Sequence, residues 1–309
     1  DYYASRGLGD VYKRQIYAGL IQQMDDAVGV VLAKLHELGL DENTIIVFTS
    51  DNGGVSSGDA YATSNYPLRG GKGRQWEGGI RVPLFIDFPG NTLKGDSCVV
   101  PVTGADLYPT FLDMAGIPLM PGQHQDGVSL LPLLQGKSIP ERALYWHYPH
   151  YGNQGGEPSS IIRQGDWKLI HYYEDGRDEL YNLRIDETES EPLNVQYPEK
   201  VEFLSKKLSV WLTEVGARYP EPDPQYNPAA EALYKKKTRE RMMKTLEATR
   251  KKQLGKDFKP NADWWGSETK DEGREIMKER NRMVSAAPPG RPVVWPSDSV
   301  SPSSPCTVA

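Results

Sequence analysis

Apolar residues recur every three or four positions from Ile16 to Leu38, and this spacing predicts an amphipathic helix that ends at Gly39. A short polar connection leads into Ile45 to Phe48, a run of β-branched and aromatic residues without polar alternation. Such a run is typical of a strand that is buried on both faces of a sheet. A second strand of this kind is predicted at Val82 to Phe88. A helix that leads into buried strands indicates an α/β sheet.

The pattern changes in the second half of the chain. A helix is predicted from Thr103 to Ala115, and an aromatic-rich segment follows at Ala143 to Tyr151. From Ser160 onward, short alternating runs separated by Gly-Asp and Asp-Gly turns predict an antiparallel sheet. An amphipathic helix is predicted from Pro198 to Gly216. These elements predict a small α+β subdomain behind the α/β part.

The ends of the chain have a different character. The first fifteen residues have no clear period, and we interpret them as a suspect, non-native start. The stretch from Ala230 to Lys256 is rich in Lys and Arg but has few apolar positions, so a solvated extension is favoured over a nucleic-acid or lipid contact. The expected segments are 1–15, the suspect start; 16–150, the α/β part; 151–218, the subdomain; 219–285, a basic helical extension; and 286–309, a disordered Pro/Ser-rich tail.

The composition narrows the classes of function. The chain has 309 residues, 38% of them hydrophobic, and a formal net charge of −6, so a globular protein without affinity for nucleic acid is expected. No apolar run reaches the roughly eighteen residues of a membrane span. Cys98 and Cys306 lie far apart, so neither a disulfide framework nor a Cys metal site is predicted. The aromatic content of 10% would suit a surface that faces carbohydrate.

The first candidate site follows the first predicted strand, where Asp51 and Asn52 precede two glycines. Ligands of open α/β sheets bind outside the carboxyl ends of strands, and a carboxylate beside an amide carbonyl suits Ca²⁺ or Mg²⁺. The alternative is a plain turn, because Asx side chains also bond their own backbone. On these residues alone the plain turn is favoured.

The second candidate is the glycine-rich loop of residues 67–83, which carries Arg69, Lys72, Arg74 and Arg81. Glycines allow the backbone to approach an anion closely. The loop is not a Walker A motif, because Gly73 follows Lys72. A hard metal and a lysine together would share the negative charge of a sulfate or phosphate ester.

At this point the sequence resembles the sulfatases of the alkaline phosphatase superfamily, in their arylsulfatase A-like branch. The resemblance covers roughly residues 16–217. It rests on five ordered pieces: YAGLIQQMDDAVGVVLAKLHELGLDENTIIVFTSDNGG, PLRGGKGRQWEGGIRVPLFIDFPG, DLYPTFLDMAGI, DGVSLLPLL and IIRQGDWKLIHYYEDGRDELYNL. It implies part of an alkaline phosphatase-like mixed sheet flanked by helices, followed by a small α+β subdomain with an antiparallel sheet and a helix.

The resemblance also implies roles for single residues. Asp51 and Asn52 match the Ca²⁺ ligands of the family, with Mg²⁺ as the alternative metal, and Lys72 matches the lysine that contacts the sulfate group. Arg69 of the same loop is a candidate substrate ligand. His147 and His150 border the substrate mouth by this resemblance, and they either contact the substrate or pack at a seam between domains. The paired Asp25 and Asp26 lie within the first predicted helix and are interpreted as structural or surface residues.

One departure from the family matters. Its nucleophile is a formylglycine made from the Cys or Ser of a CxPxR or SxPxR motif, and no such motif occurs here, since Cys98 begins CVVPV and Cys306 begins CTVA. We therefore expect a carboxy-terminal part of a sulfatase that lacks the formylglycine half and is inactive by itself. The missing half would also supply the remaining metal ligands.

The expected function is hydrolysis of sulfate esters, with sulfated carbohydrates or aryl sulfates as substrates. By family resemblance the protein is expected in the periplasm or outside the cell. Two alternatives stay open: a phosphoesterase or phosphonate hydrolase of the same superfamily, and a non-catalytic binding module. The sequence does not indicate an oligomeric state.

Overall fold

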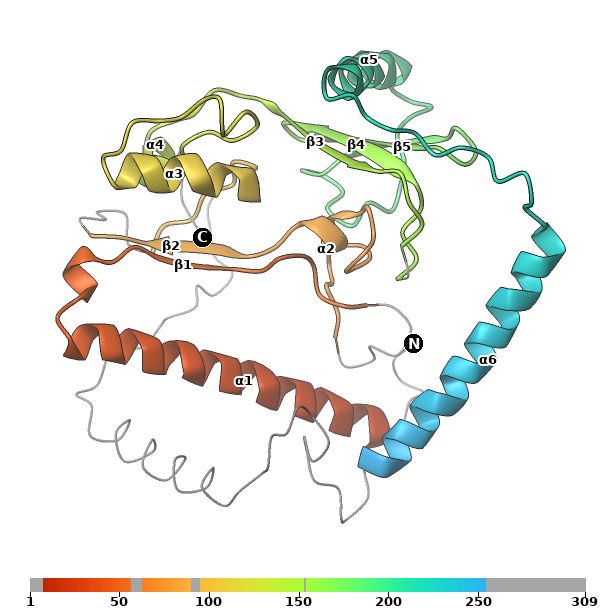
Figure 1. The fold of residues 1–309 in the computed structure, drawn as a ribbon, viewed down its shortest axis with the longest axis horizontal. Helices are drawn as coiled ribbons and strands as arrows, with labels where there is room; N and C mark the ends of the chain where they lie inside the picture. Colours follow the sequence, from red (N-terminus) through yellow and green to blue (C-terminus); the bar gives the residue numbers. More distant parts are fainter. Residues whose placement is uncertain (1–7, 57–62, 90–94, 153, 254–309) are drawn as a thin grey trace. The chain divides into compact units, whose positions relative to one another are not determined.

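The computed structural model describes residues 8–56, 63–89, 95–152 and 154–253. Residues 1–7 of the predicted start and the whole of the predicted tail, with Cys306, lie outside these residues. The described elements, in chain order, are α1 Leu8–Glu37, η1 Asp41–Asn43, β1 Ile46–Thr49, α2 Glu77–Ile80, β2 Leu84–Asp87, η2 Gly104–Asp106, α3 Leu107–Met114, α4 Leu131–Leu134, β3 Ala143–Tyr148, β4 Ser159–Gln164, β5 Trp167–Tyr172, β6 Asp178–Asn182, α5 Pro198–Glu214 and α6 Pro228–Gln253 (Figure 1). The chain forms two compact units, which divide between Glu221 and Pro222.

The first helix, α1, ends where the sequence predicts. Gly39 has a positive φ of 64°, a conformation that glycine adopts without steric cost. The backbone N–H of Gly39 donates to the carbonyl of His36 at 3.0 Å, and Leu40 donates to Leu35 at 2.9 Å. These two bonds satisfy carbonyls that the last turn of a helix otherwise leaves unpaired. The chain then turns through η1 into β1.

The two predicted α/β strands form an antiparallel pair. β1 pairs with β2 in a register that sets Ile46 opposite Asp87 and Thr49 opposite Leu84. Among the described strands β2 is the sole partner of β1. The prediction that β1 is buried on both faces is wrong in this structure, because its apolar residues Ile46, Val47 and Phe48 are only half-buried.

The four strands β3, β4, β5 and β6 form an antiparallel sheet in chain order. The aromatic-rich segment supplies its first strand, since Tyr145 of β3 lies opposite Ile162 of β4. The predicted antiparallel sheet is therefore present and has one strand more than the alternating runs alone indicate. The helix predicted after the sheet is α5, and Gly216 beyond its end has a positive φ of 62°.

Both faces of this sheet are covered. On one face Ile162, Leu169 and Leu180 are fully buried against α5. The helix contributes three leucines at intervals of four residues, Leu204, Leu208 and Leu212. On the other face Ile170 and Tyr172 pack against Trp76, which immediately precedes α2 (Figure 1). The sheet therefore separates α5 from the glycine-rich loop.

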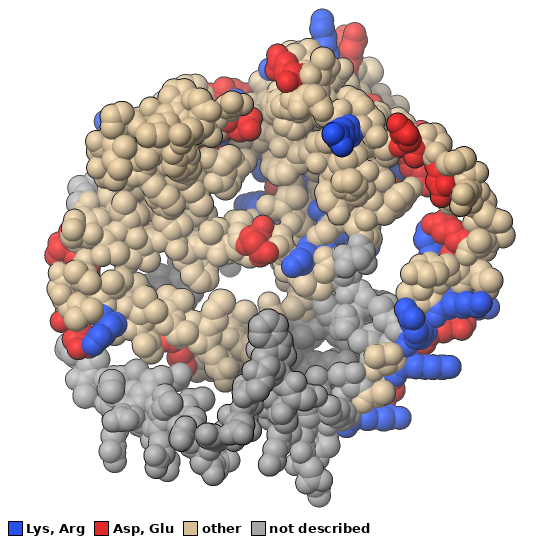
Figure 2. Space-filling view, viewed as in Figure 1, with Lys and Arg blue, Asp and Glu red and all other residues tan. Residues whose placement is uncertain are grey.

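The predicted basic extension contains the helix α6. Its Lys and Arg side chains form a group of positive charge in the space-filling view (Figure 2). Within the described part of the chain, no helix is long and apolar enough to cross a membrane.

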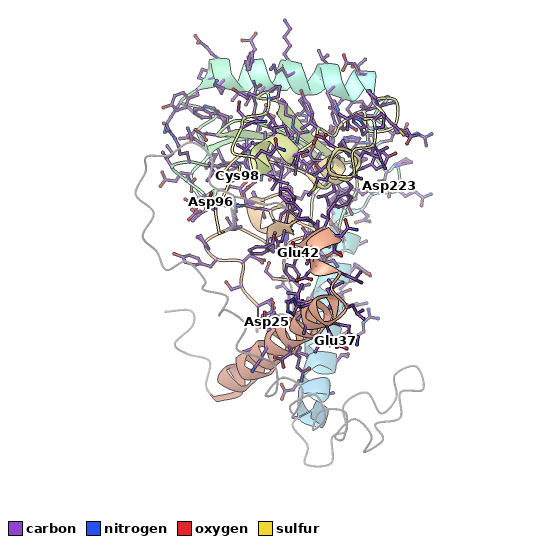
Figure 3. All side chains as sticks on the ribbon, turned by 90° about the vertical axis from the view of Figure 1, so that its left-hand side faces the viewer. Asp25, Glu37, Glu42, Asp96, Cys98 and Asp223 are labelled. Carbon is purple, nitrogen blue, oxygen red and sulfur yellow. The ribbon has the colours of Figure 1, made fainter. Side chains whose placement is uncertain are left out.

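The helix α1 exposes an apolar surface. Leu20 is 57% exposed, Met24 46% and Val31 59%. Asp25 is also exposed and Asp26 is half-buried, which is consistent with their interpretation as structural or surface residues. Figure 3 shows Asp25 and Glu37 along the same helix. Such a row of exposed apolar side chains favours association with other protein surfaces.

We predict that the 309-residue chain self-associates through α1. The triple substitution Leu20→Gln, Met24→Gln and Val31→Gln should weaken self-association at least tenfold, because it removes apolar area that association would bury. Sedimentation velocity over a range of protein concentrations measures the effect. The matched control replaces Val99 and Val195, which are 91% and 87% exposed outside α1, by Gln. A monomeric unsubstituted chain, or an equal effect of the control, would contradict the prediction.

Candidate active site

Two backbone hydrogen bonds bring the Asp51–Asn52 turn to the glycine-rich loop. The N–H of Gly53 donates to the carbonyl of Gly79 at 3.0 Å, and the N–H of Lys72 donates to the carbonyl of Gly54 at 3.0 Å. Segments about twenty residues apart in sequence therefore lie side by side. The structure thus brings together three of the predicted site residues: the Asp-Asn pair and Lys72.

The glycines of this region are needed for close backbone packing. A Cβ on Gly53 would lie 1.8 Å from the carbonyl oxygen of Gly78. One on Gly71 would lie 2.4 Å from the carbonyl oxygen of Gly54, and one on Gly79 would lie 2.1 Å from that of Arg74. Distances below 3 Å to backbone atoms leave no room for a side chain. The glycine-rich loop is therefore a packed structure that fixes the position of Lys72.

Asp51 and Asn52 present oxygen donors at the end of β1. The Asp51 residue is exposed, and Asn52 is half-buried. The hydroxyl of Ser50 donates to the backbone carbonyl of Asn52 at 3.0 Å, so the segment is also a local turn. A carboxylate and an amide carbonyl suit Ca²⁺, which takes six to eight oxygen ligands. The pair fits such an ion in chemistry and supplies only part of its ligands.

A complete metal site is not formed by acidic, His and Cys side chains in the described ranges. No group of three or more of these residues lies together within them. Cys98 is partly buried in the segment before α3 (Figure 3). The remaining ligands of a metal at Asp51 and Asn52 would therefore come from other donors.

The segment after β3 packs on the same loop. Arg74 donates from Nη1 to the carbonyl of Gly155, and a Cβ on Gly156 would lie 2.1 Å from the carbonyl oxygen of Gly73. His150 is exposed at the start of this segment, and its ring meets that of Tyr148 edge-on at 5.5 Å. His150 is therefore carried by a segment that contacts the residues next to Lys72.

His147 is held in a different environment. Its Nε2 lies 2.8 Å from the carbonyl of Arg218, and its Nδ1 lies 2.7 Å from the hydroxyl of Ser160. A carbonyl only accepts, so Nε2 carries a proton and donates to the carbonyl of Arg218. The ring of Tyr173 lies edge-on at 5.9 Å. These contacts support the packing interpretation of His147, and its role toward substrate stays a prediction.

Arg69 joins the loop to the four-stranded sheet. Its Nη1 donates to the hydroxyl of Tyr181 at 3.1 Å and to the carbonyl of Glu189 at 2.7 Å. Its guanidinium also lies 3.9 Å from the ring centroid of Trp76. All of these contacts are internal, so they make Arg69 a positioning residue for the loop. Its predicted contact with substrate stays a prediction.

A buried ion cluster, which the sequence pattern did not predict, underlies the loop. The Lys168 ammonium lies 3.0 Å from Oε1 of Glu77 and 2.7 Å from Oε1 of Glu189. Lys168 and Glu189 are fully buried, and Glu77 is 2% exposed. Glu77 begins α2, Lys168 lies in β5 and Glu189 lies in the turn after β6. The only sequence signal was a lysine within the apolar run WKLIHY.

Further contacts complete the cluster. Arg163 of β4 pairs with Oε2 of Glu77 at 3.0 Å, so two cations balance the two carboxylates. The backbone N–H of Glu77 donates to Oε2 of Glu189 at 2.6 Å. Burial raises the pKa of Glu189, and the neighbouring Lys168 ammonium opposes that rise. Glu189 also has a φ of 49°, an uncommon conformation for a residue with a side chain.

A second polar group lies on the same face of the sheet. The Glu179 carboxylate accepts from the hydroxyls of Tyr172 at 3.1 Å and Tyr181 at 2.8 Å. Burial raises the pKa of both phenols, and the Glu179 charge adds to the rise. Both hydroxyls therefore stay protonated donors at neutral pH.

Two protein-family models match the chain. The model described as Sulfatase matches residues 4–117, and the model described as N-sulphoglucosamine sulphohydrolase, C-terminal, matches residues 72–217. A sulfatase of Formosa agariphila is 34% identical over 240 residues, which are 70% of this chain and 43% of that protein. Human steryl-sulfatase is 36% identical over 156 residues, 49% of this chain and 26% of that protein. The chain thus spans less than half the length of these relatives.

Solved structures agree with the family models. Ps i-CgsB in complex with k-i-k-neocarrahexaose matches with a TM-score of 0.58 and 25% identity, over 79% of this chain and 51% of that one. BT4656 in complex with its substrate D-glucosamine-2-N,6-O-disulfate matches with a TM-score of 0.51 and 29% identity, over 62% of this chain and 39% of that one. The predicted resemblance and fold class are confirmed.

We predict that Lys168→Met destabilises the chain by about 3–5 kcal/mol, because it leaves two buried carboxylates with too little positive charge. Unfolding in urea, followed by tryptophan fluorescence, measures the change. Adding Glu189→Gln to Lys168→Met should restore part of the loss. The control is Lys34→Met, since Lys34 is an exposed lysine of α1.

The loss of stability in the Lys168→Met variant should also depend on pH. Without the ammonium, the pKa of Glu189 rises further in the folded state, so the folded protein binds a proton that the unfolded chain releases. The Lys168→Met variant should therefore lose stability as the pH rises above the ordinary carboxyl range. A loss equal to that of Lys34→Met, or one independent of pH between 5 and 8, would contradict the assignment.

Proposed function

Because the chain belongs to the sulfatase family, we propose that it forms the part of a sulfatase that contributes to calcium and sulfate binding. The observation that carries the proposal is the hydrogen bond from the N–H of Lys72 to the carbonyl of Gly54. It holds the backbone of Lys72 next to the segment that carries Asp51 and Asn52, which supports a shared role for the three residues. Such a pairing suits the several negatively charged oxygens of a sulfate ester.

Each residue has a defined task in this proposal. Asp51 and Asn52 supply two of the oxygen ligands for Ca²⁺, with Mg²⁺ as the alternative. When bound, the ion withdraws electron density from the sulfate oxygens and orients the ester. The ammonium of Lys72 neutralises charge on the same group. His150 contacts the substrate from the neighbouring segment, and Arg69 holds the loop in place.

The nucleophile lies outside the residues printed here. A sulfatase of this kind uses a formylglycine, and the 309 residues contain no CxPxR or SxPxR motif from which it could be made. We therefore propose that this chain alone binds but does not hydrolyse sulfate esters. The whole protein acts in the periplasm or outside the cell.

The proposed substrates are sulfated carbohydrates. Two structurally similar proteins were solved with a neocarrahexaose and with a glucosamine disulfate, respectively. Human steryl-sulfatase is named for a different alcohol, so aryl and steryl sulfates remain substrates to test. A phosphate or phosphonate ester would meet the same charges, and a comparison of sulfate with phosphonate monoesters in the whole protein separates the two reactions.

We predict that Lys72→Ala in a full-length enzyme with these residues lowers kcat/KM for 4-methylumbelliferyl sulfate by about 10²–10³, the usual cost of removing one group that stabilises developing charge. Fluorescence release measures the rate. Lys72→Arg should keep part of the activity, and Lys137→Ala, an exposed lysine between α4 and β3, is the matched control. The proposal fails if Lys72→Ala leaves the rate unchanged, or if the 309-residue chain turns over the ester by itself.

We predict that Asp51→Ala in the same enzyme weakens Ca²⁺ binding by about 10–100-fold or more, the scale of losses at metal sites whose ligand environment is damaged. Isothermal titration of the chelator-treated enzyme with CaCl₂ measures the dissociation constant. Asp25→Ala is the control, because Asp25 is an exposed aspartate of α1. Equal dissociation constants for Asp51→Ala and Asp25→Ala would remove Asp51 from the metal site.

A further inference from the structure

A groove runs along the outer side of α5, on the face of the four-stranded sheet opposite the glycine-rich loop. One hollow of about 510 Å³ lies between Tyr145 of β3 and the stretch of α5 from Phe203 to Glu214. A second hollow of about 440 Å³ lies between Gln196 and Phe203. Phe203 lines both hollows, so they are neighbours on one surface. We call this surface the α5 groove.

The groove is lined by aromatic rings at the edge of the core: Tyr145 and Trp211 pack against the core and are partly buried, and Phe203 lies outside it. The leucines of α5 point to the sheet, whereas Phe203 is 48% exposed. Tyr145 and Trp211 stack with their ring centroids 4.7 Å apart and their planes at 5°. Each of these rings covers one face of the other, and Val210, which lines the same hollow, is 52% exposed. Flat aromatic surfaces with polar edges suit the apolar faces of sugar rings.

Lysine side chains surround the central aromatic ring. The ammonium of Lys200 lies 5.6 Å from the ring centroid of Phe203, and that of Lys207 lies 4.9 Å from it. Lys207 also donates to Oε1 of Gln164 at 2.8 Å, which holds it in place. The acids that line the groove, Glu199 and Glu214, are near its two ends. Positive charge is therefore concentrated in the middle, around Phe203.

We propose that the α5 groove binds a sulfated oligosaccharide, with a sugar ring on Phe203 and sulfate groups at Lys200 and Lys207. The inference rests on the proposed function for its class of ligand and assigns a second surface for it. From Lys200 to Glu214 the helix is about 21 Å long at 1.5 Å per residue, which accommodates several sugar units. An apolar partner alone would leave the lysines unmatched.

The position of the groove gives it a role distinct from that of the candidate active site. The sheet lies between them, so one sugar unit cannot reach Lys72 and Phe203 together. A long sulfated polymer can contact both surfaces. Its binding in the α5 groove then raises the effective concentration of its sulfate esters at the candidate active site. The groove should therefore matter for polymers and leave small sulfate esters unaffected.

The test measures binding of a κ-carrageenan hexasaccharide to the full 309-residue chain by isothermal titration. Phe203→Ala and the double substitution Lys200→Ala with Lys207→Ala should each raise the dissociation constant at least tenfold. Phe203→Trp should retain binding, because it keeps an aromatic face. The controls are Lys34→Ala with Lys137→Ala, two exposed lysines elsewhere, and the hexasaccharide after chemical desulfation, which should bind at least tenfold more weakly. Circular dichroism checks that each variant is folded.

Several results would overturn the inference: no binding of the hexasaccharide, equal binding of its desulfated form, or unchanged binding by the groove variants. Loss of binding on substitution of Lys235, Lys236 and Lys237 by Ala, with the groove variants unaffected, would assign the ligand to α6. If Lys72→Ala alone abolishes binding, the inference fails and the proposed function stands. If the groove variants lose binding while a full-length enzyme hydrolyses no sulfate ester, the proposed function fails and the groove remains a binding surface.

Discussion

The arrangement of the candidate site depends on one buried ammonium group. Lys168 is fully buried in the four-stranded sheet and lies between the carboxylates of Glu77 and Glu189. A buried charge is tolerated only when opposite charges and hydrogen bonds compensate its lost hydration. Here the compensating carboxylates come from two segments, Glu77 at the start of α2 and Glu189 in the turn after β6, so the cluster forms only when the glycine-rich loop and this turn are both seated on the sheet.

Close glycine packing extends this constraint to the site. Glu77 begins α2, and the carbonyl of Gly79 in that helix accepts the hydrogen bond from Gly53, next to Asn52. The Lys72 amide is bonded to Gly54 one residue further on. The position of α2 on the sheet therefore sets the position of both candidate ligands and of the lysine. The groove along α5 lies on the other face of the same sheet and shares none of these contacts.

Local pattern was sufficient for most of the secondary structure. The apolar spacing predicted α5 and the part of α1 from Ile16 onward, and the turn signals predicted the antiparallel sheet; α1 begins earlier, at Leu8. The burial of β1 was not predictable, because an apolar run shows what a strand is able to bury and not which neighbours it has. The aromatic segment was not predicted to be a strand, because its partner strand β4 begins only after the connecting segment of residues 149–158.

In the candidate site, too, some residues could be predicted from local sequence and others only from the tertiary structure. Asp51, Asn52 and Lys72 could be predicted as candidates because turn residues, hard oxygen donors and a basic glycine loop stand out in a sequence. The contacts of Arg69 with Tyr181 and Glu189 join residues more than a hundred positions apart, and no local pattern reports them. The glycines of the loop proved to be sites of close contact between backbone segments, and this contact depends on the tertiary structure alone.

The central claim is that the ion cluster at Lys168 holds the loop of Lys72 beside Asp51 and Asn52. Hydrogen–deuterium exchange of the amides of Gly53 and Lys72, in the unsubstituted chain and in Lys168→Met, tests it most directly. The account predicts that both amides exchange faster in the variant, under conditions in which amides of α5 keep their protection. Unchanged exchange at Gly53 and Lys72 in a destabilised Lys168→Met variant would contradict it.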